Sequence, residues 1–228
     1  MHSASSDFEA GIRGLNAEAL RLFIAVELPD AVHQFISQVI GEFRQHDLPG
    51  IRWVRPDGVH LTLKFLGNVP GSQVVTIAQA MESVVSEVSP FVLHVGSVGV
   101  FPHMRAPRVL WVGIQGETEP LKQLHLRLEE ALKALGFVKE KRAYSPHLTL
   151  GRIKGRLPAP ELQRLSDATE QLQGTGSAML PVAGLSLMES QLTREGAVYR
   201  RKAHIYLKNR LAGPSESCYT SPSFVKGK

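Results

Sequence analysis

The tetrapeptide His-Leu-Thr-Leu occurs twice in this chain, at residues 60–63 and 147–150. Successive side chains of a β-strand point to opposite faces of the sheet. Each copy would therefore turn a histidine and a threonine to one side and two leucines to the other. The leucines suit a buried core, and the polar pair would be held rigidly on the opposite side. The duplication favours two similar α+β halves that face each other.

The pattern of apolar residues predicts strands and helices that alternate along the chain. Strands are expected where apolar residues alternate or form short runs, and helices where they recur every 3.6 residues. The expected strands cover residues 21–28, 51–54, 91–101, 108–114, 183–192 and 197–207 besides the two motifs, and the expected helices cover residues 30–47, 73–85, 120–136 and 160–172. A strand and a helix therefore precede the first motif, and another strand and helix precede the second. No glycine-rich fingerprint follows the first strand, which argues against a nucleotide-binding Rossmann domain.

The composition is that of an ordinary globular protein. The 228 residues are 43% hydrophobic and 21% charged, enough to build a core without disulfide bonds. The single cysteine, Cys218, excludes an internal disulfide and a cysteine-rich zinc site. We expect a flexible leader at residues 1–19, a single two-lobed domain at residues 20–210, and a disordered basic tail containing Ser and Pro at residues 211–228.

Two segments hold most of the excess positive charge. Residues 200–228 contain seven Lys/Arg and one acidic residue, within a chain whose net charge is +5. A second basic group flanks the second motif and consists of Lys139, Lys141, Arg142, Arg152, Lys154 and Arg156. Such clusters either keep a protein soluble or bind a polyanion such as nucleic acid. No apolar run is long enough to span a membrane and no signal peptide is visible, so we expect a cytoplasmic protein.

Two imidazoles and two hydroxyls at one site suit the chemistry of a phosphodiester. Because histidine titrates near neutral pH, one of His60 and His147 could take a proton from water while the other gives one to the leaving oxygen. Thr62 and Thr149 could donate hydrogen bonds to the non-bridging oxygens, and an arginine could offset their charge. The alternative is that both histidines are structural core residues, which is common for one such motif and rare for two identical ones.

The other histidines form no metal-site pattern. A zinc site would need further ligands at a recognisable spacing, and His94, His103 and His125 do not provide one. We therefore expect no metal and no cofactor. His33 and His125 are expected on the surfaces of their helices.

At these residues the sequence resembles the two-histidine (2H) phosphoesterases, in particular the RNA 2′,3′-cyclic phosphodiesterase branch, also called 2′-5′ RNA ligase. The similarity runs from about Arg21 to Leu207 and is carried by "RLFIAVELP", "WVRPDGVHLTLKFLGNV", "RVLWVGI" and "YSPHLTLGRI". It implies an α+β fold of two pseudo-symmetric lobes. Each lobe would have mainly antiparallel sheet with helices packed outside, and the active-site cleft would lie between them. It also implies metal-independent hydrolysis of RNA 2′,3′-cyclic phosphate ends to 2′-phosphate ends, with 2′-5′ ligation as a side activity.

The resemblance also implies roles for individual residues. The acid–base pair would be His60 and His147, and Thr62 and Thr149 would bind phosphate. Arg152 matches a family arginine that contacts phosphate. Strict alternation would turn Arg152 away from His147 unless the strand bulges at Gly151. Phe23 lies where the family often has an aromatic residue, so its ring is expected either to stack on a nucleobase or to pack in the core. Lys64 and Tyr144 have the same two interpretations.

The implied partner is RNA with 2′,3′-cyclic phosphate ends, tRNA fragments included, bound by a monomer that contacts no membrane. Two other functions stay open. One is a related enzyme that acts on a small cyclic nucleotide or on 2′-5′ oligoadenylate, and the other is an RNA-binding module without catalysis. An RNA enzyme should gain from added 5′ nucleotides and a mononucleotide enzyme should not. The intact His/Thr pairs argue against the module.

Overall fold

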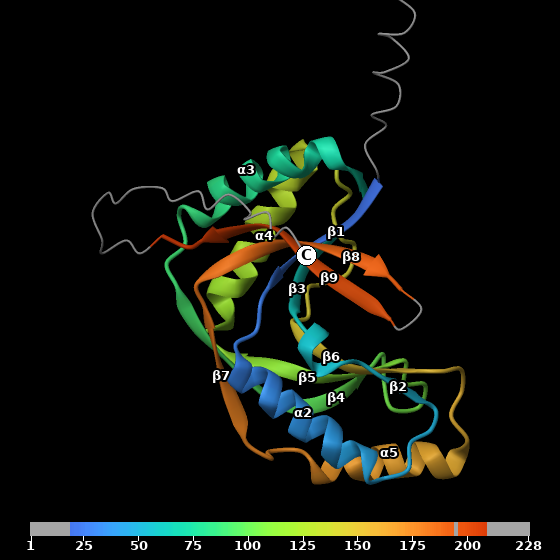
Figure 1. Cartoon of the computed structure of the whole chain (residues 1–228). Coiled ribbons are helices and arrows are strands. Elements are labelled where there is room, and N and C mark those ends of the chain that lie inside the picture. The colour runs from blue at the N-terminus through green and yellow to red at the C-terminus, as the bar shows by residue number, and fades with distance from the viewer. Residues whose placement is uncertain (1–18, 194–195, 209–228) are drawn as a thin grey trace, which may run out of the picture.

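Two antiparallel sheets lie back to back with helices on their outer sides. The computed structural model describes residues 19–193 and 196–208. The two helix pairs lie at the top and bottom of the view in Figure 1, with both sheets between them. The expected leader, except Ala19, and the expected tail lie outside the described residues. None of the helices in the described ranges has the length and apolarity of a membrane-spanning segment.

The first sheet has the strand order β3-β1-β8-β9. These strands are β1 (Ala19–Val26), β3 (Leu61–Pro70), β8 (Gly184–Leu192) and β9 (Ala197–Tyr206). Helices α3 (Val74–Val85) and α4 (Thr118–Ala134) pack against each other and cover one side of this sheet. The sheet contributes alternating apolar residues to that side, among them Leu22, Ile24, Val26, Leu61 and Leu63, all of which are buried. The leucines of the first motif therefore belong to the core beneath the helices.

The second sheet has the strand order β2-β6-β5-β4-β7. These strands are β2 (Ile51–Trp53), β4 (Phe91–Phe101), β5 (Val109–Gly116), β6 (His147–Ile153) and β7 (Ser177–Val182). Helices α2 (Asp30–Arg44) and α5 (Ala159–Gln171) cover its outer side. Leu148 and Leu150 of the second motif are completely buried, as are Leu110 and Val112 on the neighbouring strand β5. The second motif thus repeats the arrangement of the first.

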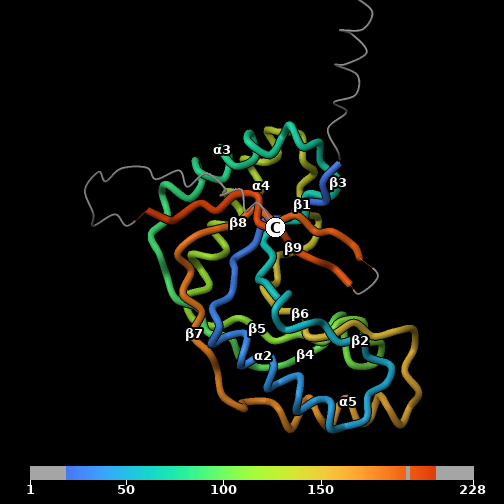
Figure 2. The backbone as a smooth tube through the Cα atoms, viewed as in Figure 1, coloured from blue at the N-terminus to red at the C-terminus, as the bar shows by residue number. Residues whose placement is uncertain are grey.

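The two repeats of the sequence do not correspond to the two lobes. Within each repeat the motif strand pairs with the strand before it, β3 with β1 and β6 with β5. The intervening helices are exchanged: α2 packs against β7 of the second sheet, and α4 packs against β3 of the first. The tube in Figure 2 follows the chain from β1 down to α2 and from β5 up to α4. An apolar stripe shows that a helix needs an apolar surface but does not identify the surface, so the sequence did not reveal this exchange. The expected α+β fold of two pseudo-symmetric lobes, with helices packed outside mainly antiparallel sheets, is confirmed.

Most expected elements are present with small shifts at their ends. The α+β class with antiparallel sheets is confirmed. Residues 55–58, with their turn composition, contain a short 3₁₀ helix at Pro56–Gly58. Strand β7 was not predicted, because its six residues include Pro181 and lack a continuous apolar pattern.

Candidate active site

The two His-Leu-Thr-Leu segments meet at the junction of the sheets. Strands β3 and β6 contact each other although they belong to different sheets. In each motif the leucines are buried and the threonine is partly exposed. Because the helices cover the leucine side, the threonine side is the one that faces the other sheet. We call this the inner side of each sheet.

Both histidines are held by the same backbone contact. Nδ1 of His60 lies 3.0 Å from the carbonyl oxygen of Gly58, and Nδ1 of His147 lies 2.7 Å from that of Ser145. A carbonyl oxygen only accepts hydrogen bonds, so Nδ1 carries the proton in each ring. That leaves Nε2 of each histidine to exchange a proton with a substrate.

Aromatic rings surround His60. Its imidazole stacks on Phe23 with ring centroids 4.4 Å apart, and Tyr199 meets it edge-on at 4.9 Å. Burial lowers the pKa of His60 to about 4, although its contact with the Gly58 carbonyl acts in the opposite direction. His60 is therefore a neutral imidazole at pH 7, the form that can accept a proton. The ring of Phe101 meets His147 edge-on at 4.9 Å.

The hydroxyls of the two motif threonines are free to bind a ligand. Within the part of the chain that the structure describes, neither the Thr62 nor the Thr149 side chain has a hydrogen-bond partner. Both stand two residues after a histidine on the inner side of their strands. The two motifs thus present the same pair of groups, an imidazole Nε2 and a threonine hydroxyl.

A bulge brings Arg152 to the inner side. Gly151 lies opposite Leu110 of β5, whereas Thr149 lies opposite Trp111, so β6 has one extra residue at this point. As a result two consecutive residues, Leu150 and Gly151, are buried and Arg152 is exposed. A Cβ at position 151 would lie 2.6 Å from Cγ2 of Ile51, which explains the glycine. The bulge required for Arg152 to share a side with His147 is present, and its contact with phosphate stays a prediction.

Phe23, Lys64 and Tyr144, which were expected either to contact the substrate or to pack in the core, all make contacts inside the protein. Phe23 is 2% exposed and lies against His60, so its stacking on a nucleobase stays a prediction. Lys64 is 4% exposed and points to the helix side, where its Nζ lies 2.8 Å from Oε1 of Glu129 and donates to the Val138 carbonyl at 2.7 Å. The Tyr144 hydroxyl donates to the backbone carbonyl of Thr62 at 3.2 Å.

His125 is buried, contrary to the expectation of a surface residue. It is 7% exposed, its ring stacks on Tyr144 at 4.1 Å, and its Nδ1 lies 3.1 Å from the carbonyl oxygen of Leu63. The reason is its spacing on α4, because position 125 comes four residues after Leu121 and three before Leu128, which are both buried. A second bulge lies opposite it: Thr62 pairs with Ala25 but Lys64 pairs with Ile24, which takes Leu63 out of register. The backbone carbonyls of Thr62 and Leu63 therefore have side-chain hydrogen-bond partners, Tyr144 and His125 respectively. Burial lowers the pKa of His125.

A further polar cluster that the sequence did not indicate lies beside the first motif. Ala25 separates Thr62 from Ser186 in the sheet, and His204 lies opposite Ser186 on the next strand. The Ser186 hydroxyl donates to the Glu27 carboxylate and lies 2.7 Å from Nδ1 of His204. The contact with His204 lowers the pKa of Glu27 most, Ser186 and Arg201 lower it further, burial opposes them, and the pKa is about 2. No local spacing could have revealed residues so far apart in the chain.

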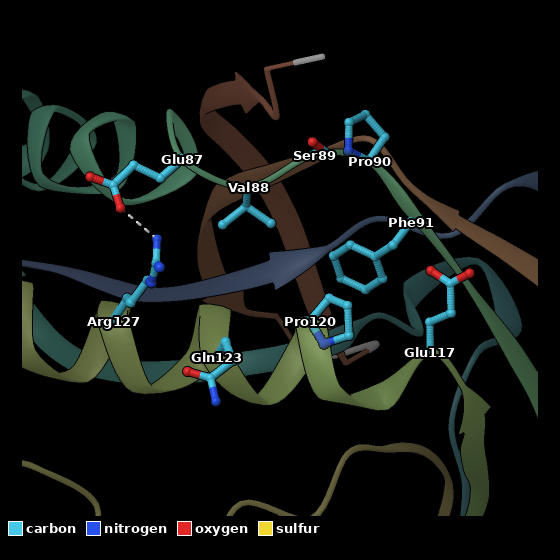
Figure 3. Close-up of a pocket in the computed structure, with 9 residues that line it drawn as sticks. All are labelled: Glu87, Val88, Ser89, Pro90, Phe91, Glu117, Pro120, Gln123 and Arg127. Atoms are coloured by element: carbon cyan, nitrogen blue, oxygen red, sulfur yellow. Dashed lines mark hydrogen bonds and ion pairs between the residues drawn. The ribbon is translucent and has the colours of Figure 1, made fainter. Parts of the chain in front are cut away.

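Two hollows elsewhere contain no residue of either motif. One, of about 370 Å³, lies between the end of α3 and the starts of β4 and α4, with the Glu87–Arg127 ion pair at its rim (Figure 3). The other, of about 420 Å³, lies against His103, Met104 and Arg105 in the loop after β4. Neither brings two histidines together, so the chemistry places the candidate site at the junction of the sheets.

Comparison with known proteins matches the same part of the chain. A sequence profile described as 2′-5′ RNA ligase superfamily matches residues 28–194, which include both motifs. An Archaeoglobus fulgidus protein named RNA 2′,3′-cyclic phosphodiesterase is 31% identical over 181 residues, covering 79% of this chain and 97% of that protein. A Methanothermobacter thermautotrophicus protein with the same name is 31% identical over 180 residues, covering 79% and 95%. The crystal structure of E. coli LigT complexed with 3′-AMP has a TM-score of 0.66 and 25% identity, covering 84% of this chain and 100% of that one.

Proposed function

The chain belongs to the 2′-5′ RNA ligase superfamily, and from this premise we propose that it hydrolyses RNA 2′,3′-cyclic phosphate ends to 2′-phosphate ends with His60 and His147 as its acid–base pair. Its enzyme class is that of its relatives, RNA 2′,3′-cyclic phosphodiesterase. One observation carries the mechanism: both motifs fix their histidine through Nδ1 to a carbonyl two residues earlier. Nε2 of each ring is thereby left free to accept or donate a proton.

Hydrolysis exchanges one bond at phosphorus for another. One histidine removes a proton from water through Nε2 as the water oxygen bonds to phosphorus. The bond from phosphorus to the ribose O3′ breaks, and the other histidine gives its Nε2 proton to that oxygen. The products are a 2′-phosphate and a 3′-hydroxyl. The two histidines have exchanged protonation states, which solvent restores before the next turnover.

The threonines and Arg152 stabilise the charge that develops on the phosphate oxygens. Hydroxyl groups donate hydrogen bonds, and a guanidinium adds charge-assisted ones in a planar fork. Two observations support these roles: within residues 19–193 and 196–208 the hydroxyls of Thr62 and Thr149 have no hydrogen-bond partner, and the bulge in β6 exposes Arg152. Because these side chains supply proton transfer and charge compensation together, we propose that the reaction proceeds without a metal or other cofactor.

The same site can transfer the phosphate to RNA. If the 5′-hydroxyl of a second RNA takes the place of water, its oxygen bonds to phosphorus and its proton goes to the base. The bond to O3′ breaks as before, which leaves a 2′-5′ phosphodiester. One P–O bond replaces another, so no additional energy source is required. Water is far more abundant than RNA ends, so ligation is a side activity.

The proposed partners are RNA ends, those of tRNA fragments included. A cytoplasmic location and a monomeric state stay predictions from the sequence.

The test is an assay of the purified protein in EDTA with an oligonucleotide that ends in a 2′,3′-cyclic phosphate. The expected product has gained one water and carries a 2′-phosphate, which mass spectrometry and phosphorus NMR identify. A 3′-phosphate product would contradict the proposed bond cleavage. Loss of activity in EDTA with rescue by zinc or magnesium would contradict the two-histidine mechanism.

A further inference from the structure

Strand β2 places a second arginine beside Arg152. Arg52 lies directly opposite Arg152 in the pairing of β2 with β6, so both side chains leave the same side of the sheet. The neighbouring pair, Ile51 and Ile153, is buried on the helix side, whereas both arginines are exposed. Arg52 therefore extends the inner face that carries the second motif by one strand.

These two positive charges have no partner within residues 19–193 and 196–208. Neither guanidinium makes an ion pair or a hydrogen bond there. Asp57, an acid close to Arg52 in sequence, is engaged by Arg55 at 2.7 Å. Arg108 adds more positive charge, since it precedes the residue that pairs with Arg152 and donates to the Gly155 carbonyl.

Like charges placed directly opposite each other destabilise a sheet. Anionic oxygens bound at the two guanidinium groups would offset the repulsion and supply the missing hydrogen-bond acceptors. The guanidinium fork matches the oxygen geometry of phosphate. If Arg152 serves the reacting phosphate, the next charge along an RNA strand is the phosphodiester one nucleotide upstream.

We propose that Arg52 binds the internucleotide phosphate on the 5′ side of the terminal nucleotide, which rests on the proposed function and names its substrate class. The substrate is then an oligoribonucleotide of at least two nucleotides. A cyclic mononucleotide has no phosphate for Arg52 and loses that contact. Arg52 is a binding residue for the substrate and takes no part in proton transfer.

Three substrates isolate this contact. They are a 2′,3′-cyclic mononucleotide, a dinucleotide with a 2′,3′-cyclic phosphate end, and the same dinucleotide with an uncharged methylphosphonate linkage. Arg52→Ala should lower kcat/KM for the natural dinucleotide about tenfold, mainly through KM, as expected for one charged hydrogen bond. It should leave the other two substrates unchanged, and Arg52→Lys should keep part of the effect. Lys133→Ala, which removes an exposed positive charge on α4, is the matched control and should change none of the three.

Two outcomes overturn the proposal. One is an equal loss on all three substrates, which indicates a structural role, and the other is no loss on the natural dinucleotide. Binding is measured separately by fluorescence anisotropy with a labelled oligonucleotide that carries a 2′-phosphate. Arg52→Ala should bind it about tenfold more weakly and with a salt slope smaller by about 0.7. If the parent protein hydrolysed none of the substrates, the proposed function would fail, while equal binding by parent and variant would refute the role of Arg52.

Discussion

At the scale of single residues, a backbone carbonyl decides which nitrogen of each histidine is left free to exchange a proton. The bonds from His60 to Gly58 and from His147 to Ser145 span the same two residues. The rings differ in what surrounds them, because His60 lies between Phe23 and Tyr199. This packing excludes water from one imidazole and keeps it neutral at pH 7. A neutral imidazole suits a base, and the pH dependence of the reaction tests this.

The activity of the free enzyme should persist well below pH 6.5. If His60 acts as the base, the acidic limb of kcat/KM should follow its pKa of about 4. If His60 acts as the acid, kcat/KM should already have fallen by pH 7, since almost none of it is protonated there. A kcat/KM profile between pH 3.5 and 9 decides between the two roles, and an NMR titration of His60 checks the assignment.

The same pKa predicts how stability changes with pH. Because the pKa of His60 is about 4 folded and about 6.5 unfolded, its contribution to stability is complete above pH 6.5 and is lost as pH falls toward 4. His60→Gln cannot be protonated, so its midpoint of urea unfolding should fall less than that of the parent between pH 7 and 4. An identical fall in both proteins would show that His60 is not desolvated.

The motif threonines should matter for activity and little for stability. Thr62→Ala or Thr149→Ala removes one hydrogen bond to a charged oxygen, worth roughly 1.5–3 kcal/mol, so kcat/KM should fall by tens of fold. Serine at either position keeps the hydroxyl and should keep most of the activity. Thr76→Ala, an exposed threonine on α3, is the control and should have no effect. Loss of activity only in proportion to lost folded protein would contradict a role in phosphate binding.

At the scale of elements, buried polar contacts on the helix side of the sheet connect β3 to α4 and to the segment after it. The Lys64–Glu129 ion pair joins β3 to α4, with the two side chains 4% and 2% exposed. Glu129 also accepts a hydrogen bond at 3.0 Å from the backbone N–H of Glu140, in the segment that leads to the second motif. The position of one motif is thereby connected to the chain that enters the other.

Removal of one member of the ion pair should be costlier than removal of both. Glu129→Leu leaves Lys64 buried and unpaired, which should reduce the free energy of unfolding by about 3–5 kcal/mol. The double variant Lys64→Met/Glu129→Leu should recover most of that loss, because no uncompensated charge remains. Urea unfolding of the two single variants and the double variant provides the measurement. Additive losses would mean that the two side chains do not interact.

The bulges at Gly151 and Leu63 show what the sequence could predict and what it could not. The bulge in β6 could be anticipated for two reasons. Gly151 offers a position without a side chain, and without a bulge Arg152 would point away from His147. The bulge at Leu63 has no glycine, so it could not be inferred. The burial of His125 could have been, because its spacing from Leu121 and Leu128 places it on the buried face of α4. The motif residues themselves were recognisable because their spacing is local. The cluster of Glu27, Ser186 and His204 depends on strand pairing across the whole chain, which no local pattern contains.

At the scale of the whole molecule, the exchange of α2 and α4 joins the two lobes into one unit. Each sheet is covered in part by a helix from the other sequence repeat, so neither repeat can bury its apolar surfaces alone. The two tryptophans of the chain, Trp53 and Trp111, both lie in the second sheet. Their fluorescence therefore reports on one lobe, whereas far-ultraviolet circular dichroism reports on both.

Damage to the first lobe should unfold the second. Ile77 is completely buried on α3, and Ile77→Ala should reduce the free energy of unfolding by roughly 2–5 kcal/mol. The fluorescence midpoint in urea should fall together with the circular dichroism midpoint. Lobes that fold independently would instead leave the fluorescence transition where it is in the parent. Val75→Ala, at an exposed position on the same helix, is the control.

The exchanged helices also determine how the molecule can move. Within residues 19–193 and 196–208, the chain passes between the lobes six times: from β1 to α2, β2 to β3, α3 to β4, β5 to α4, α4 to β6 and β7 to β8. Hinge opening requires a few joints that rotate together, and six connections spread across the molecule oppose such a rotation. The spacing of the two inner faces is then fixed before any RNA arrives. We therefore expect an RNA 3′ end that is paired in a duplex to resist this enzyme until the end frays, because the protein cannot widen to admit it.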